Sequence, residues 1–301
     1  MRVSTEGFAD FDGHRTWYRV EGQLRSGAAE GPAPLITLHG GPGETHDYLL
    51  ALTDLAANGR AVVFYDQLGN GRSTHLPERG GDFWTVELFV RELANLIDHL
   101  GVGDGYHVLG SSWGGFLAQE HAIMQPGGLR SLVLSDTAAS FPDFVSECNR
   151  LRQDLPPDVE ATLRRHEEAG TTDSTEYEEA CMVFYRRHLC RLGEFPEELM
   201  RSFGAIAEDP TVYHTMNGPS EFHVIGTIKD WQSKDRLGQI LVPALVVSGR
   251  YDEATPALQE PLVAGISETE QVIFEESSHT PFVEERGRYM AVVDDWLRRH
   301  D

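Results

Sequence analysis

Cysteine is scarce in this sequence, and long apolar runs are missing. Its 301 residues include three cysteines, none of them in Cys-x-x-Cys spacing. An odd count without paired spacing disfavours a disulfide framework and a zinc site, so we expect buried thiols at Cys148, Cys181 and Cys190. No apolar stretch reaches the roughly 18 residues that a membrane helix needs, and the opening segment from Met1 to Gly7 lacks the apolar core of a signal peptide. These absences favour a cytoplasmic protein.

Positive charge is also scarce. Lys and Arg number 25 against 48 Asp and Glu, which gives a formal net charge of −23. Nucleic acids and anionic lipid surfaces attract basic patches, so this balance argues against both as partners. It mildly favours a cationic substrate through electrostatic steering, although solubility alone also explains an acidic surface.

The apolar runs that are present are short and lie between glycine and proline residues. The stretch from Phe8 to Val20 alternates around Asp12-Gly13, which predicts a β-hairpin. Six further runs are too short for helices and rich in branched residues, as expected for strands that are buried on both faces of a parallel sheet. They cover residues 35–38, 61–65, 107–109, 132–134, 244–247 and 271–274.

Helical spacing appears between the predicted strands. Residues 93–100 and 290–297 each carry an apolar stripe with the period of a helix, and Gly101 ends the first of them. Strands that alternate with helices predict an α/β fold, with a mostly parallel twisted sheet and helices on both faces.

This alternation stops at residues 140–234, where the pattern is helical and heavily charged. Thr175 followed by Glu178 indicates a capping box at the start of one helix in this stretch. We therefore predict that residues 1–139 and 235–301 form the two parts of one core, and that 140–234 form a helical cap inserted between late strands.

The most informative segment joins a predicted strand to a predicted helix. Residues 107–109 lead into Gly110-x-Ser112-x-Gly114, and a helical stretch follows. A strand-turn-helix context of this kind is typical of a nucleophile elbow, in which glycines relieve crowding around a serine and the helix N-terminus directs backbone amides at the site. Ser112 has glycine two residues away on both sides and Ser111 does not, so we predict Ser112 as the nucleophile.

A serine hydroxyl needs a base, and the base needs an orienting carboxylate. In this architecture the chain order is serine, acid, histidine, with the acid and the histidine just after late strands. Asp252 and His279 follow two of the last predicted strands, so both fall at carboxyl ends, where ligands bind in open α/β sheets. Glu253 is the alternative acid, and we rank Asp252 first.

Two backbone N–H groups are expected to form an oxyanion hole. One belongs to Trp113, the residue after the predicted nucleophile. The other belongs to the loop His39-Gly40-Gly41-Pro42-Gly43, in which we assign Gly41, with Gly40 as the alternative. The following loop, residues 65–73, is interpreted as structural and without a chemical role.

These motifs resemble the proline iminopeptidase (prolyl aminopeptidase) family of serine α/β hydrolases, especially its tricorn-interacting branch. Position 111 departs from the pattern, because many members carry glycine there. The matching segments span most of the chain and are His39-Gly40-Gly41-Pro42-Gly43, Tyr65-Asp66-Gln67-Leu68-Gly69, Gly110-Ser111-Ser112-Trp113-Gly114-Gly115, Met216-Asn217-Gly218-Pro219-Ser220-Glu221-Phe222 and Tyr251-Asp252-Glu253-Ala254-Thr255-Pro256.

The resemblance implies an α/β-hydrolase fold that works without a metal or other cofactor. It implies a triad of Ser112, Asp252 and His279, with Gly41 and Trp113 as the oxyanion donors.

The resemblance also implies that Glu221 and Glu253 bind the free α-ammonium of a substrate. An ammonium shielded by a cap needs carboxylate partners to offset its desolvation, although either glutamate also fits a solvated position in so acidic a chain. Tyr213, Phe222 and Trp231 are candidates for lining a pocket for a small apolar ring, and core packing explains each of them at least as well.

The predicted activity is removal of an N-terminal residue, proline preferred, from short peptides through an acyl-enzyme. No nucleic-acid, membrane or obligate protein partner is expected. The alternative is an amidase or ester hydrolase that acts on L-amino acid amides with the same triad, because cap geometry decides how large a leaving group fits. A catalytically silent hydrolase fold used as a receptor is disfavoured, since such a scaffold has no need for all three groups.

Overall fold

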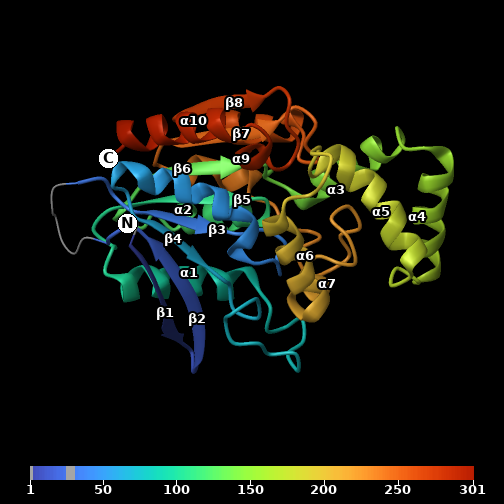
Figure 1. Ribbon diagram of the computed structural model, residues 1–301, viewed down its shortest axis with the longest axis horizontal. Helices are drawn as coiled ribbons and strands as arrows, with labels where there is room; N and C mark the ends of the chain where they lie inside the picture. The colour runs from blue at the N-terminus through green and yellow to red at the C-terminus, as the bar shows by residue number, and fades with distance from the viewer. Residues whose placement is uncertain (1–2, 25–30) are drawn as a thin grey trace.

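The computed structural model describes residues 3–24 and 31–301, which contain one eight-stranded sheet in the order β1-β2-β4-β3-β5-β6-β7-β8 (Figure 1). Residues 1, 2 and 25–30 of the predicted core lie outside the described residues. β2 pairs antiparallel with β1 and β4, and all other pairs are parallel. The strands are β1 (Ser4–Phe11), β2 (His14–Glu21), β3 (Leu35–Leu38), β4 (Val62–Tyr65), β5 (Tyr106–Ser111), β6 (Leu129–Ser135), β7 (Ala244–Gly249) and β8 (Thr269–Phe274).

The predicted hairpin and all six predicted runs are confirmed as strands, some of them longer than expected. Burial on both faces is confirmed for five of the six runs and is wrong for 271–274, because β8 is an edge strand in which Gln271 is exposed. Asp12 and Gly13 turn the hairpin with φ values of 49° and 83°, as a primed turn requires. Along β4 the side chains alternate between two apolar cores, with Val62 and Phe64 in one and Val63 and Tyr65 in the other. The sequence of a strand that is buried on both faces is therefore a continuous apolar run.

Helices cover both faces of the sheet, which confirms the predicted α/β fold. The helices α1 (Val86–Leu100) and α2 (Trp113–Ile123) contribute to one core. The 3₁₀ helix η1 (His46–Asn58) and α10 (Arg286–Arg299) contribute to the other. α1 ends where predicted, because Gly101 adopts φ 65° and its N–H closes the last turn.

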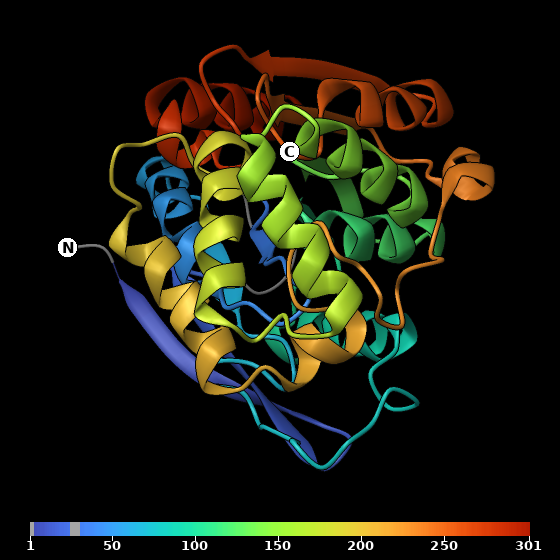
Figure 2. The same ribbon diagram turned by 90° about the vertical axis from the view of Figure 1, so that its right-hand side faces the viewer.

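Five helices lie between β6 and β7 in the chain, within the stretch predicted as a cap. Figures 1 and 2 show α4 to α7 beyond the end of the sheet toward which the β6 arrow points. The boundaries of the cap stay a prediction. The five helices are α3 (Phe141–Arg152), α4 (Pro157–Ala169), α5 (Thr175–His188), α6 (Glu197–Glu208) and α7 (Thr211–Met216).

The capping box predicted at Thr175 is wrong by one residue. Ser174 has the extended backbone of an N-cap, and its hydroxyl accepts a hydrogen bond from the Tyr177 N–H at 3.2 Å. Thr175 is already the first helical residue, so its hydroxyl does not occupy the capping position.

The remaining short helices lie just before β7, between β7 and β8, and just after β8. Among the described residues no helix is both long and apolar enough to cross a membrane. The three cysteines are buried and free, as predicted. These short helices are η2 (Lys234–Gln239), η3 (Pro256–Gln259), α8 (Glu260–Gly265) and α9 (Pro281–Glu284).

Candidate active site

Ser112 occupies a strained turn between β5 and α2. Its backbone has φ 54° and ψ −122°, a combination that residues with a side chain rarely adopt. A Cβ on Gly110 would lie 2.1 Å from the carbonyl oxygen of Gly114, and one on Gly114 would lie 2.1 Å from that of Leu38. The two glycines that flank Ser112 are therefore required by direct backbone contact.

Asp252 and His279 lie in the loops that follow β7 and β8. His279 Nδ1 is 2.6 Å from Asp252 Oδ1, and the same oxygen accepts the Ala254 N–H at 2.8 Å. Asp252 is 0% exposed, whereas His279 and Ser112 line the same cavity. The chain thus brings the three predicted residues to the carboxyl ends of β5, β7 and β8.

The charge on His279 is set by the acids around it. Burial alone would lower the pKa of His279, but the Asp252 carboxylate, which also accepts its hydrogen bond, and the Glu253 carboxylate raise this pKa well above 6.5. With Nδ1 directed at Asp252, Nε2 is left for proton transfer in the cavity.

Asp136 is a further carboxyl at this site that the sequence pattern did not indicate. It follows β6, lines the cavity, and accepts hydrogen bonds from the Ser135 hydroxyl at 2.6 Å and the Gly249 N–H at 3.3 Å. Burial, and then the negative charge of Asp252, raise the pKa of Asp136 well above its usual range. A signal was available, because Asp136 also stands at the carboxyl end of a predicted strand.

The backbone N–H groups of Gly41 and Trp113 form a candidate anion-binding site. Within the described residues neither donates a hydrogen bond, and both residues line the cavity. The Gly40 N–H donates to the Tyr48 hydroxyl at 2.7 Å and is therefore occupied. Gly41 adopts φ 103°, which glycine tolerates. This geometry favours Gly41 over Gly40 as the second donor.

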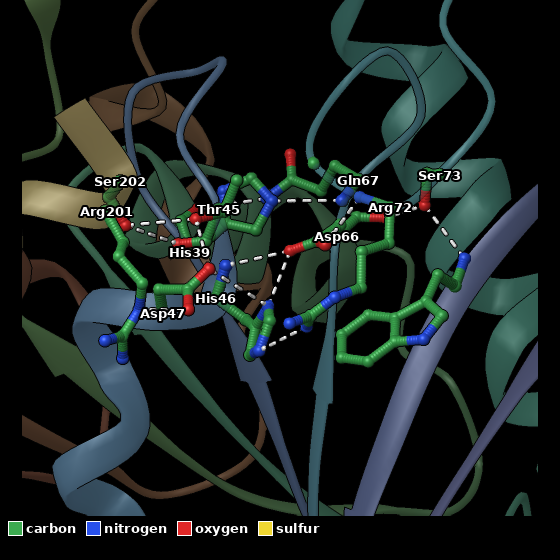
Figure 3. Close-up of polar contacts among 12 residues, drawn as sticks. His39, Thr45, His46, Asp47, Asp66, Gln67, Arg72, Ser73, Arg201 and Ser202 are labelled. Atoms are coloured by element: carbon green, nitrogen blue, oxygen red, sulfur yellow. Dashed lines mark hydrogen bonds and ion pairs between the residues drawn. The ribbon is translucent and has the colours of Figure 1, made fainter. Parts of the chain in front are cut away.

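Gln67 links the two segments that carry these N–H groups. Its Nε2 donates to the His39 carbonyl at 2.9 Å, and its Oε1 accepts the Trp113 indole N–H at 3.0 Å. Its backbone N–H donates to His39 Nε2 at 3.0 Å (Figure 3). Burial lowers the pKa of His39 to about 4, so the ring stays neutral and accepts this bond. Sequence reasoning missed this bridge, because nothing in the loop's composition shows which carbonyl Gln67 contacts.

The loop after β3 is also attached to α6 of the inserted helices (Figure 3). The Thr45 hydroxyl lies 3.1 Å from that of Ser202, which also accepts the Tyr48 N–H at 3.3 Å. Arg201 donates to Asp47 at 2.9 Å. The inserted helices therefore help to hold the loop that carries Gly41.

Glu221 and Glu253, the two predicted amine ligands, are both buried at the site. Glu221 is 8% exposed, lines the cavity and accepts a hydrogen bond from the Tyr213 hydroxyl. Glu253 is 0% exposed, its oxygens accept no hydrogen bond from the described residues, and its Oε1 lies 4.0 Å from His279 Nε2. Burial raises the pKa of both carboxyls. A cation in the cavity would favour their ionised forms.

The aromatic wall of the cavity differs from the predicted one. Tyr213, Phe222 and Trp231 are not among the residues that line it. Tyr213 supports Glu221, Phe222 packs 4.8 Å from another aromatic ring of the inserted helices, and the Trp231 indole donates to a glutamate on α2. The aromatic residues that line the cavity are Trp113, Phe116, Phe141 and Phe144.

Comparison with known proteins identifies a matching family model and several similar proteins. The family model of the alpha/beta hydrolase fold matches residues 33–286. A proline iminopeptidase of Thermoplasma volcanium is 37% identical over 295 residues, which cover 98% of this chain and 97% of that protein. The crystal structure of a proline iminopeptidase from Mycobacterium smegmatis aligns with a TM-score of 0.90 at 42% identity, covering 98% of each chain. The crystal structure of VinJ aligns with a TM-score of 0.96 at 50% identity, covering 99% of each chain.

Proposed function

This chain belongs to the proline iminopeptidase family of serine α/β hydrolases, and from that premise we propose that it removes an N-terminal residue, proline preferred, from short peptides. The observation that carries the proposal is a single cavity lined by Ser112 and His279 and by a buried carboxylate, Glu221, with a second buried acid, Glu253, beside it. A cytoplasmic location remains a prediction from the composition.

The proposed reaction passes through an acyl-enzyme. Ser112 attacks the carbonyl carbon while His279 takes its proton through Nε2, and the imidazolium then protonates the leaving amine. Asp252 holds the ring by the 2.6 Å bond to Nδ1. The N–H groups of Gly41 and Trp113 stabilise the oxyanion, and water then hydrolyses the ester.

Glu221 and Glu253 give the proposed site its preference for a free amino terminus. An ammonium that enters this buried cavity loses its water, and two carboxylates compensate for that loss. An acetylated substrate carries no positive charge at its N-terminus. It would therefore leave Glu221 and Glu253 buried without the cation that keeps them ionised.

The test compares free and acetylated substrates. We expect N-acetyl-proline anilide to be hydrolysed with a kcat/KM roughly 10² to 10³ lower than proline anilide, as for the loss of one partner of a buried ion pair. Glu221→Gln should lower kcat/KM for proline anilide much more than for a neutral ester. Equal rates on the two anilides would contradict amine recognition and leave the triad untouched.

A second candidate is an amidase that acts on L-amino acid amides. The small size of the site favours it, since each of the two parts of the cavity beside Ser112 has a volume of only about 10 Å³. Rates on prolinamide, a prolyl dipeptide and a longer prolyl peptide separate the two functions. Rates that collapse beyond the amide would favour the amidase.

Gln67 provides a separate test of the proposed oxyanion hole. Gln67→Ala removes both side-chain bonds of the bridge, so we expect kcat to fall by roughly 10- to 100-fold, in line with small misplacements in other active sites. KM should change little, because the bridge contacts no substrate. Gln67→Glu keeps the acceptor for Trp113 and loses the donor to His39, so its kcat should lie between that of the natural chain and that of Gln67→Ala. A loss confined to KM would argue against a role for Gln67 in positioning the donors.

A further inference from the structure

Glu44 is a buried acid that the proposed mechanism does not use. It is 7% exposed, and no hydrogen bond to its carboxyl is found among the described residues. Ser112 Cβ and Glu44 Oε2 each lie 3.0 Å from the position that a Cβ on Gly40 would occupy, so this carboxyl is close to the nucleophile. An unpaired carboxyl beside the reacting atoms points to contact with the substrate.

The cavity has two parts, which share Ser112, Glu221 and His279. The first part, here called the aromatic part, is lined by Gly41 and by Ala254, the neighbour of Glu253, as well as by the aromatic wall. Because both proposed oxyanion donors, Gly41 and Trp113, line this part and not the other, it takes the N-terminal residue of the substrate, whose carbonyl oxygen they would bind.

The second part, here called the acidic part, therefore takes the leaving group, and His279 stands between the two. Its lining includes two carboxyl groups and, among the described residues, neither Lys nor Arg. The residues that line the acidic part are Glu44, Tyr48, Ser112, Leu189, Leu199, Glu221, His279 and Thr280.

We propose that Glu44 selects against a leaving group that carries a carboxylate next to the scissile amide. The preferred substrates are then aminoacyl amides and peptides whose first leaving residue is itself amidated or peptide-bonded, and free dipeptides are disfavoured. This inference rests on the proposed function and specifies the substrate class of the same site.

The physical reason is the cost of burying a second negative charge. The leaving residue of a dipeptide holds its carboxylate two bonds from the scissile nitrogen, which places it in the acidic part. There it finds Glu44 and Glu221, with His279 at the junction of the two parts and neither Lys nor Arg among the described lining residues. Like charges brought together in a poorly solvated site cost several kcal/mol, whereas an amide in the same place costs no such repulsion.

The selection should strengthen as pH rises. Burial, and then the charge of Glu221, raise the pKa of Glu44 to about 8, so this carboxyl is neutral below that pH and negative above it. The other titratable groups facing it are Glu221, Glu253, His279 and the hydroxyls of Tyr48 and Tyr213. A neutral Glu44 repels a carboxylate less than an ionised one.

The experiment measures kcat/KM for prolyl-leucine and prolyl-leucinamide. For the natural chain we expect the amide to be preferred by only a few-fold at about pH 7, where Glu44 is mostly neutral, and by roughly 10- to 100-fold at about pH 9, where Glu44 is ionised. Glu44→Gln, which keeps the shape of the side chain, should lower the preference at about pH 9 at least about tenfold and remove its pH dependence. Glu198→Gln, a half-exposed position on α6 that lines neither part of the cavity, is the matched control and should behave like the natural chain.

Equal rates on the two substrates, or a preference that Glu44→Gln leaves unchanged, would overturn the inference. The pH dependence in the natural chain tests it without any variant. If either of these two contradicting results were obtained, hydrolysis of proline anilide would still support the proposed function. Failure to hydrolyse any substrate with a free N-terminal proline would overturn both.

Discussion

Replacing Ser112 with alanine is expected to lower kcat by about 10⁶-fold, the size of loss found when a triad serine is removed from another serine hydrolase. The hydroxyl oxygen is the atom that forms the ester, whereas Ser111, the last residue of β5, is buried and is not among the residues that line the cavity. The side chain of Ser112 lines the cavity and makes no bond that holds the turn, so the fold should persist. Initial rates on proline anilide, with a thermal melt of each protein, check this result.

Ser111→Ala is the matched control, because it removes a buried hydroxyl one residue away. This variant should retain most of the activity of the natural chain. If Ser112→Ala retained most of its activity as well, an acyl-enzyme on Ser112 would be excluded. Mass spectrometry after rapid quenching would then show no acyl adduct on the peptide that contains Ser112.

The candidate site residues that sequence reasoning singled out by position are those that a local pattern defines. Ser112 is recognisable because its flanking glycines are required by contacts within the turn and with β3. Asp252 and His279 are recognisable because each directly follows a run that predicts a strand. Their meeting at one edge of the sheet follows from parallel strands, whose carboxyl ends share that edge.

The residues that sequence reasoning missed depend on contacts between distant segments. Asp136 matters because β6 lies beside β7, and the strand order is not contained in any single run. Glu44 matters because the inserted helices bring Glu221 to it. Gln67 matters because β4 and β5 lie on either side of β3, so that one side chain reaches both proposed donor segments.

Sequence reasoning also could not separate the aromatic residues that line the cavity from those that pack elsewhere. Aromatic residues of the inserted segment bury their apolar surface by packing on one another, as the ring of Phe222 does against that of Phe184. Composition gives no means of separating these from Phe141 and Phe144, which begin α3 directly after the site strand β6. Only the path of the chain after β6 places these two rings beside Ser112.

Replacing Asp252 with asparagine is expected to have the second largest effect, a loss in kcat of about 10⁴-fold, as in other triads. Asparagine keeps the size of the side chain, but its amide does not stabilise the imidazolium and allows the wrong tautomer of His279. Asp143→Asn, an exposed position on α3, is the control and should leave kcat unchanged.

The pH profile separates this electrostatic role from a structural one. Attack requires neutral His279, and in the natural chain the Asp252 carboxylate helps to raise the pKa of His279 well above 6.5. The acid limb of kcat/KM should therefore lie above that value in the natural chain, with activity lost as pH falls through it. In Asp252→Asn the negative charge is gone, so the pKa of His279 falls and the acid limb moves to lower pH even though the maximum rate is much smaller. A variant that merely distorted the loop would lower the rate at every pH and leave the limb where it was, and that result would refute the assignment of Asp252.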